Sequence, residues 1–173
     1  MMDETEFWRL VDDSRDEAEG DVEVQADLLV ERLTALDPEQ VVDFSRHFEA
    51  RWNRAYTWDV WAACVLLTDA ADEDTFAAFR CWLIAQGREV FESALYEADE
   101  LADLLADFDP ETDGDGEDVG YAADEAYERL TGGELPDLGL GPAPEEPTGE
   151  PLDPADRQAV ADRAPRLAER FGS

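Results

Sequence analysis

Apolar residues recur at intervals of three and four along most of the chain, which is the spacing of one face of an α-helix. The first such segment covers residues 4–19 and precedes Gly20, a residue suited to the position after a helix. The second covers residues 22–36 and stops before Pro38, because a proline disfavours helical geometry in the residue before it. The pattern predicts two amphipathic helices.

A strong start signal for a third helix lies between Asp37 and Gln40. Asp37 suits the N-cap, Pro38 suits the first helical position, and the Gln40 side chain can reach back to the cap. The residues that follow predict one buried face and an opposite face in water. The predicted buried stripe consists of Val41, Phe44, Phe48, Trp52 and Ala55.

The next two helices carry the most apolar part of the sequence. Residues 58–67 are apolar nearly all round, which predicts a central buried helix. Asp72 can cap the following helix, which contains Phe76, Phe79 and Leu83 on one face. Gly87 is predicted to end it and to begin a new helix; the alternative is one long helix in which Gly87 permits close packing.

Helical spacing continues to Phe108 and returns over residues 119–130, whereas residues 132–152 contain five Gly and five Pro. This division predicts a helical domain over residues 3–131, a Pro/Gly-rich linker over 132–152 and a helical tail over 153–173. The tail helix is expected to start at Asp153 and Pro154. It is expected either to pack on the domain or to make no contact with it. The fold class is all-α, a single compact domain of about eight helices, because no β-alternation is visible.

One stretch, from Trp58 to Leu95, carries a recognisable motif. It opens with an aromatic-Asp-aromatic group and an acidic turn, and then continues with Phe76, Phe79, Arg80, Trp82, Leu83, Ile84, Gln86, Gly87, Arg88, Val90 and Phe91. This pattern resembles the bacterial family catalogued as domain of unknown function 4240. The resemblance covers roughly residues 3–132 and departs from the family at residues 68–71, where a turn commonly carries glycines. It implies a soluble helical protein and brings no established activity.

The net charge limits the kinds of molecule that the protein can bind. Forty-six acidic residues against thirteen basic ones give a formal net charge of −33. Such a field repels the phosphates of nucleic acids and the anionic face of a membrane, because both are bound through clustered basic residues. The N-terminus has no basic region followed by an apolar one, and no apolar run reaches the roughly 20 residues that span a bilayer. We therefore expect a cytoplasmic protein that binds neither nucleic acid directly nor membranes.

An acidic loop resembles a calcium loop at its beginning. Oxygen ligands occupy relative positions 1, 3, 5 and 7, and a glycine occupies position 6. The residue at position 12, where a bidentate glutamate normally closes the cage, is Gly120. We therefore favour a solvated loop over a metal site. The candidate ligands are Asp109, Glu111, Asp113 and Asp115.

The sequence offers few residues for a catalytic or zinc site. His47 is the only histidine, and Cys64 and Cys81 both lie in apolar helical patterns that predict buried free thiols. One histidine and two distant cysteines do not form a zinc site unless a carboxylate joins them. The sequence also lacks a glycine-rich phosphate loop and a nucleophile elbow. No cofactor is expected, and a non-enzymatic role is favoured.

The scarce positive charge gathers near the aromatic motif. Five of the thirteen arginines lie there: Arg46, Arg51, Arg54, Arg80 and Arg88. The favoured interpretation is that arginines near the core bridge carboxylates such as Asp59, Glu89 or Glu92. The alternative is an anionic-ligand site with flat apolar walls and directional donors. Its residues would be Trp58, Asp59, Trp61, Arg80, Trp82, Gln86 and Arg88.

Three functions follow from these features. The leading hypothesis is a protein-interaction module, because the chain has a well-patterned core and no assembled catalytic group. The second is a small-molecule, anion-binding protein or an enzyme that uses the arginine and aromatic region. The third is an acidic DNA mimic, because regularly spaced carboxylates could imitate a duplex that carries one charge per roughly 1.7 Å.

The origin of the acidity can be tested by salt. All thirteen basic residues are Arg, which is typical of a G+C-rich genome such as an actinobacterial one; salt adaptation also produces acidic surfaces. We favour genome composition and expect the protein to be folded in low salt, with a thermal midpoint measured by circular dichroism. A protein that folds only in molar salt, where the Debye length falls to about 3 Å, would instead be salt-adapted.

Overall fold

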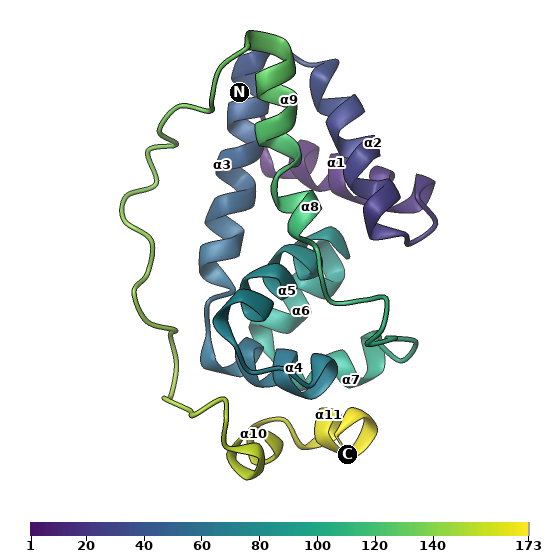
Figure 1. Ribbon diagram of the computed structural model, residues 1–173, viewed down its shortest axis with the longest axis vertical. Coiled ribbons are helices and arrows are strands. Elements are labelled where there is room, and N and C mark those ends of the chain that lie inside the picture. Colours follow the sequence, from purple (N-terminus) through teal and green to yellow (C-terminus); the bar gives the residue numbers. More distant parts are fainter. Residues whose placement is uncertain (173) are drawn as a thin grey trace.

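The computed structural model describes residues 1–172, and its regular structure is helical (Figure 1). The helices are α1 (Glu4–Glu17), α2 (Val22–Thr34), α3 (Pro38–Arg54), α4 (Trp58–Thr68), α5 (Glu73–Ala85), α6 (Arg88–Tyr96), η1 (Ala98–Glu100), α7 (Leu101–Leu104), α8 (Glu117–Gly120), α9 (Ala122–Thr131), α10 (Arg157–Arg163) and α11 (Pro165–Phe171). Within these residues the only β pairing is an isolated bridge between Thr57 and Thr148. The all-α prediction is confirmed. The helices outnumber the eight or so expected because several predicted segments are divided, such as 119–130 into α8 and α9.

The molecule is elongated, with α2, α3 and α9 in one half and α4 to α7 in the other (Figure 1). Helix α9 packs against α2 and α3, and α8 packs against α2 and α5. Helix α5 lies at the centre, where it also contacts α1, α3, α4 and α6. No helix of residues 1–172 has both the length and the apolar character needed to cross a bilayer.

The core follows the predicted apolar stripes. Every residue from Val60 to Leu67 in α4 is buried, which confirms the buried helix predicted there, although α5 rather than α4 is the central helix. Five phenylalanines are fully buried: Phe7, Phe44, Phe76, Phe79 and Phe91. Complete burial of such a side chain contributes about 1.5–3 kcal/mol. The packing of α1, α3, α5 and α6 around these rings therefore supplies much of the stability.

The helix-end signals read from the sequence are also confirmed. Gln40 accepts a hydrogen bond from the Asp37 backbone N–H at 3.4 Å, and Pro38 is the first residue of α3. Asp72 accepts from the backbone N–H of Thr75 at 2.9 Å at the start of α5. Gly87 has φ +102°, a left-handed value that L side chains rarely adopt, and it separates α5 from α6.

The start predicted for the tail helix was wrong. Helix α10 begins at Arg157 rather than after Asp153 and Pro154, because Asp156 is the residue whose carboxylate accepts from the N–H of Ala159, at 3.1 Å. Asp153 instead accepts from Ala155 within a turn. An Asp-Pro pair is compatible with a turn as well as with a helix start.

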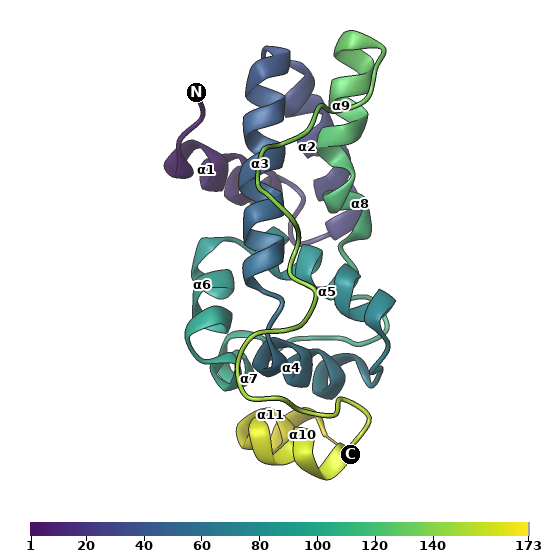
Figure 2. The ribbon, with the colours of Figure 1, turned by 90° about the vertical axis from the view of Figure 1, so that its left-hand side faces the viewer.

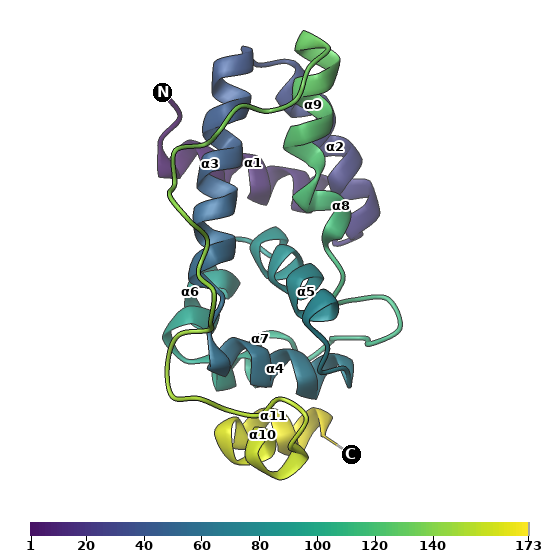
Figure 3. The same cartoon turned by 60° about the vertical axis from the view of Figure 1, so that its left-hand side comes forward.

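The C-terminal helices dock on the domain. Helix α10 packs against α4, and α11 packs against α4, η1 and α7. Val160 and Leu167 are fully buried there. Residues 132–156, which we call the strap, contain no helix and run beside α3 from the end of α9 to α10, as the turned views show (Figures 2 and 3).

The close approach of α8 to α5 depends on one glycine. A Cβ atom on Gly116 would lie 2.4 Å from the backbone nitrogen of Trp82 and 2.8 Å from the carbonyl carbon of Cys81. The Gly116 N–H donates to the carbonyl oxygen of Ala78 at 3.0 Å. Any side chain at this position must therefore push the two segments apart.

Substitution of Gly116 by alanine is expected to lower the free energy of unfolding by about 2 kcal/mol, because backbone atoms cannot yield to the added methyl group. The measurement is urea denaturation followed by tryptophan fluorescence. Gly133→Ala is the matched control, since its Cβ would meet its nearest atom at 3.8 Å. Equal stability of the two variants would contradict the close approach.

Candidate functional site

Arg80, which the sequence suggested as a donor of an anion site, lies inside the core. The side chain is only 3% exposed. Its guanidinium carbon lies 3.7 Å from the ring centroid of Trp52, 4.6 Å from that of Tyr56 and 4.8 Å from that of Phe76. One terminal nitrogen donates to the Trp52 carbonyl oxygen at 3.0 Å. The cation is therefore enclosed by aromatic faces, an arrangement stabilised by their negative electrostatic potential.

The expected neutralisation of Arg80 by a carboxylate was wrong. Within residues 1–172 Arg80 forms no ion pair, and burial lowers its pKa to about 10. Asp59 pairs instead with Arg163 at 2.9 Å, whereas Glu92 pairs with Arg88 at 3.0 Å, as expected. Removing the charged guanidinium of Arg80 from water is unfavourable, and its contacts with the three rings offset part of that free energy.

Of the three predicted aromatic walls, Trp61 and Trp82 are buried and Trp58 is half-buried. Trp61 is 8% exposed and stacks between Trp58, at a centroid distance of 5.5 Å, and Phe76, at 4.7 Å. Trp82 is 3% exposed and makes an edge contact with Phe108 at 5.2 Å. Trp61 and Trp82 therefore form part of the core, and Trp58 packs against it.

The remaining residues of the predicted site lie apart from Arg80. Gln86 caps the C-terminus of α5 and is half-buried. Arg88 is exposed and forms ion pairs with both Glu92 and Glu4, the latter at 3.4 Å. The structure therefore does not bring the seven predicted residues together around one cavity.

His47 has a structural role. Its Nε2 lies 2.9 Å from the carbonyl oxygen of Met2, and its Nδ1 lies 3.2 Å from a terminal nitrogen of Arg51. Because a guanidinium only donates, Nδ1 must accept and Nε2 must carry the proton. Arg51 also pairs with Glu4 at 3.2 Å, so this group connects α1 to α3.

The carboxylates of the acidic loop bind backbone groups of the loop itself. Asp113 accepts from the N–H of Asp109, Asp109 from that of Glu111, and Asp115 from that of Glu117, each at 3.0 Å. In residues 1–172 no three His, Cys, Asp or Glu side chains converge in a way that could hold a metal ion. The loop oxygens thus stabilise local turns.

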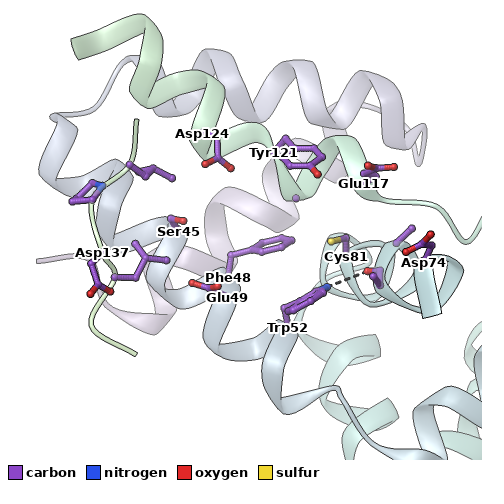
Figure 4. Close-up of a pocket in the computed structure, with 16 residues that line it drawn as sticks. Ser45, Phe48, Glu49, Trp52, Asp74, Cys81, Glu117, Tyr121, Asp124 and Asp137 are labelled. Atoms are coloured by element: carbon purple, nitrogen blue, oxygen red, sulfur yellow. Dashed lines mark hydrogen bonds between the residues drawn. The ribbon is translucent and has the colours of Figure 1, made fainter. Parts of the chain in front are cut away.

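A cleft of about 900 Å³ lies where four segments meet, and we call it the acidic cleft (Figure 4). Its walls come from α3, from α5, from α8 with the start of α9, and from strap residues 135–138. Its lining residues are Ser45, Phe48, Glu49, Trp52, Asp74, Ala77, Ala78, Cys81, Glu117, Gly120, Tyr121, Asp124, Leu135, Pro136, Asp137 and Leu138.

Aromatic and apolar groups line the interior of the acidic cleft. Phe48 and Trp52 extend from α3, and Tyr121 extends from the α8–α9 junction (Figure 4). The indole nitrogen of Trp52 donates to the Ala77 carbonyl oxygen at 3.0 Å, which fixes the ring against α5. Cys81 is a free, half-buried thiol rather than the fully buried one predicted, and burial raises its pKa to about 12. It therefore stays protonated at neutral pH.

No basic residue lines this interior. Five carboxylates surround it: Glu49, Asp74, Glu117, Asp124 and Asp137. None of the five forms an ion pair within residues 1–172. Partial burial raises the pKa of Asp124 above its ordinary value, because desolvation disfavours its ionised form. The acidic cleft is consequently a region of uncompensated negative charge over an aromatic surface.

Sequence reasoning missed the acidic cleft for a definite reason. Phe48 and Trp52 were both assigned to the buried stripe of α3, yet Trp52 is only half-buried. The walls come from segments that stretch from Ser45 to Leu138, and no local motif marks them. The half-burial of Trp52 depends on the positions of α5 and the strap. The periodicity of apolar residues in α3 carries no information about those positions.

These features describe an elongated helical protein that carries an acidic cleft with an aromatic interior. Residues 2–129 match the model of a family of proteins of unknown function, DUF4240, and the chain belongs to that family. This confirms the resemblance read from the Trp58–Leu95 motif. No curated protein and no solved structure matches the chain. The matched residues contain the helical walls of the acidic cleft, whereas the strap lies beyond them.

The ring enclosure of Arg80 can be tested by two substitutions. Arg80→Lys should lower the free energy of unfolding by about 2 kcal/mol, because a compact, strongly hydrated ammonium cannot stack on three rings. Arg80→Met should stay within about 1 kcal/mol of wild type, since it removes the buried charge and keeps the volume. Chemical denaturation measures both, with exposed Arg54→Lys as control. A lysine variant as stable as the wild type would contradict the stacking.

Proposed function

We propose that this protein is an interaction module whose acidic cleft binds a positively charged segment of a partner protein. The single observation that supports the proposal most is the set of five carboxylates that lack ion-pair partners around an aromatic interior. Nine of the thirteen arginines form ion pairs with other carboxylates in residues 1–172: Arg32, Arg46, Arg51, Arg88, Arg129, Arg157, Arg163, Arg166 and Arg170.

The chemistry of the acidic cleft fits an arginine-bearing ligand. A guanidinium donates two parallel hydrogen bonds to a carboxylate and stacks on aromatic faces. Trp52 and Tyr121 supply such faces, and Glu49 and Asp124 supply carboxylates from the two opposing helices α3 and α9. A volume of about 900 Å³ accommodates several side chains of a partner rather than one.

The competing anion-binding hypothesis has less support. It needs the positive groups of the motif to face a shared cavity. The Arg80 guanidinium is enclosed by three rings, and Arg88 is occupied by two carboxylates on the surface. The acidic cleft, which does open on the surface, has the opposite charge.

Neutralising the acidic cleft should weaken binding of a basic peptide. The probe is acetyl-Ser-Arg-Ser-Arg-Ser-Arg-Ser-amide, measured by isothermal titration calorimetry at physiological salt. The triple variant Glu49→Gln, Asp74→Asn, Asp124→Asn removes three attractive charges, each contributing up to about 1 kcal/mol, so the affinity should fall about tenfold or more.

The control separates the acidic cleft from the general negative field. Asp27→Asn, Glu31→Gln, Glu169→Gln removes the same charge from exposed carboxylates outside the cleft, and its affinity should stay within about twofold of wild type. Equal losses in the two triple variants would overturn the proposal, as would equally tight binding of the same peptide with Glu in place of Arg.

Binding should also depend on pH. Because the pKa of Asp124 is raised, this carboxylate takes up a proton at a higher pH than an ordinary aspartate does, and protonation removes a charge that attracts the peptide. As pH is lowered, affinity should therefore begin to fall at a higher pH than the titration of an ordinary aspartate would give. Titrations at several pH values measure this profile. In Asp124→Asn the decline should begin at lower pH, and an unchanged profile would contradict the assignment.

A further inference from the structure

The strap forms one wall of the acidic cleft and is the wall that lies outside the family match. Leu135 and Leu138 are half-buried, and Asp137 contributes one of the five carboxylates. Between Gly132 and Gly139 the strap has no helix, and it follows an extended path beside α3 (Figure 2). A ligand in the acidic cleft would therefore lie against this extended segment.

The main chain of this wall is largely unpaired. Within residues 1–172 the backbone N–H groups of Glu134, Leu135, Asp137 and Leu138 donate no hydrogen bond. Among the carbonyl groups of residues 134–138, only that of Leu138 accepts one, from Arg46. Unpaired main-chain groups on an extended segment are a template for another extended chain.

The same strap already pairs in this manner at its other end. Thr148 donates its N–H to the carbonyl oxygen of Tyr56 at 3.0 Å and accepts from the N–H of Trp58 at 3.0 Å. The two hydrogen bonds form the parallel bridge between Thr57 and Thr148. The strap backbone is thus capable of β-type pairing with an extended neighbour.

One arginine holds the wall in place. The Nε atom of Arg46 donates to the Leu138 carbonyl oxygen at 2.8 Å, while a terminal nitrogen of the same side chain pairs with Asp43 at 2.8 Å. Arg46 does not line the acidic cleft itself. It therefore fixes the strap against α3 from outside the binding surface.

We infer that the partner segment binds in the acidic cleft as an extended peptide that pairs through its main chain with strap residues 134–138. This inference rests on the proposed function and specifies its ligand. In an extended peptide, side chains alternate between two faces, so arginines at every second position point together towards the carboxylates. The main chain provides affinity, and the acidic cleft selects the charge of the side chains.

Backbone methylation of the probe tests the main-chain pairing. In a strand that pairs along one edge, alternate residues direct their N–H groups towards that edge. Two versions of acetyl-Ser-Arg-Ser-Arg-Ser-Arg-Ser-amide carry N-methyl groups, one on the arginine amides and one on the internal serine amides, with charge unchanged. One version should bind at least tenfold more weakly than the parent peptide, and the other should remain within about threefold. Equal behaviour of the two versions, whether both bind or both fail, would overturn the inference.

Substitution of Arg46 gives a second and opposite-signed test. Arg46→Gln removes a positive charge near the acidic cleft, so electrostatics alone predicts equal or tighter binding of the basic peptide. Release of the strap predicts binding weakened at least threefold, because the main-chain template is no longer held in place. Circular dichroism and the thermal midpoint establish that the variant is folded. Unchanged or tighter binding would overturn the role of the strap.

The two proposals fail in different ways. If the parent peptide does not bind, or binds equally to the neutralised triple variant, the proposed function itself is wrong. If the parent peptide binds and depends on the cleft carboxylates, but both methylated peptides behave alike, only the main-chain pairing is wrong.

Discussion

The arrangement around the acidic cleft depends on a cation that is buried among three aromatic rings. Arg80 joins Trp52 at the end of α3 to Tyr56 and to Phe76 of α5, and it also binds the Trp52 carbonyl oxygen. Trp52 also lines the acidic cleft. The Tyr56 carbonyl oxygen accepts a hydrogen bond from the backbone N–H of Thr148 in the strap. Arg80 therefore positions both Trp52, which lines the cleft, and Tyr56, which binds the C-terminal part of the strap.

The distribution of charge follows from the shortage of positive residues. With thirteen arginines for forty-six acidic groups, most carboxylates remain without a partner. The ion pairs that form mainly connect helices: Arg51 joins α3 to Glu4 of α1, and Arg163 joins α10 to Asp59 of α4. Because surface carboxylates are solvated, unpaired charge costs little at most positions. In the acidic cleft five such carboxylates surround an aromatic interior, and desolvation raises the pKa of one of them, Asp124, so a cationic ligand gains more beside this group than at a fully solvated carboxylate.

The most recognisable part of the sequence is mainly structural. The stretch from Trp58 to Leu95 carries the family motif, and its central residues, such as Trp61 and Trp82, are buried. Aromatic side chains at helical spacing contribute large apolar areas, so they serve a core as readily as a ligand site. Of this stretch, only residues on the outer face of α5, Asp74, Ala77, Ala78 and Cys81, line the acidic cleft.

The sequence by itself determined the helical class, the main helix boundaries and the caps at Asp37, Asp72 and Gly87, because these depend on spacing and on side chains within one turn. It also determined which stripes are buried. Only the tertiary structure decided that Trp52 is half-buried, that Arg80 is stacked rather than ion-paired, and that the strap forms one wall of a cleft beside α3. These features depend on contacts between residues far apart in the chain, such as Arg46 and Leu138, and local periodicity carries no information about which distant segments meet.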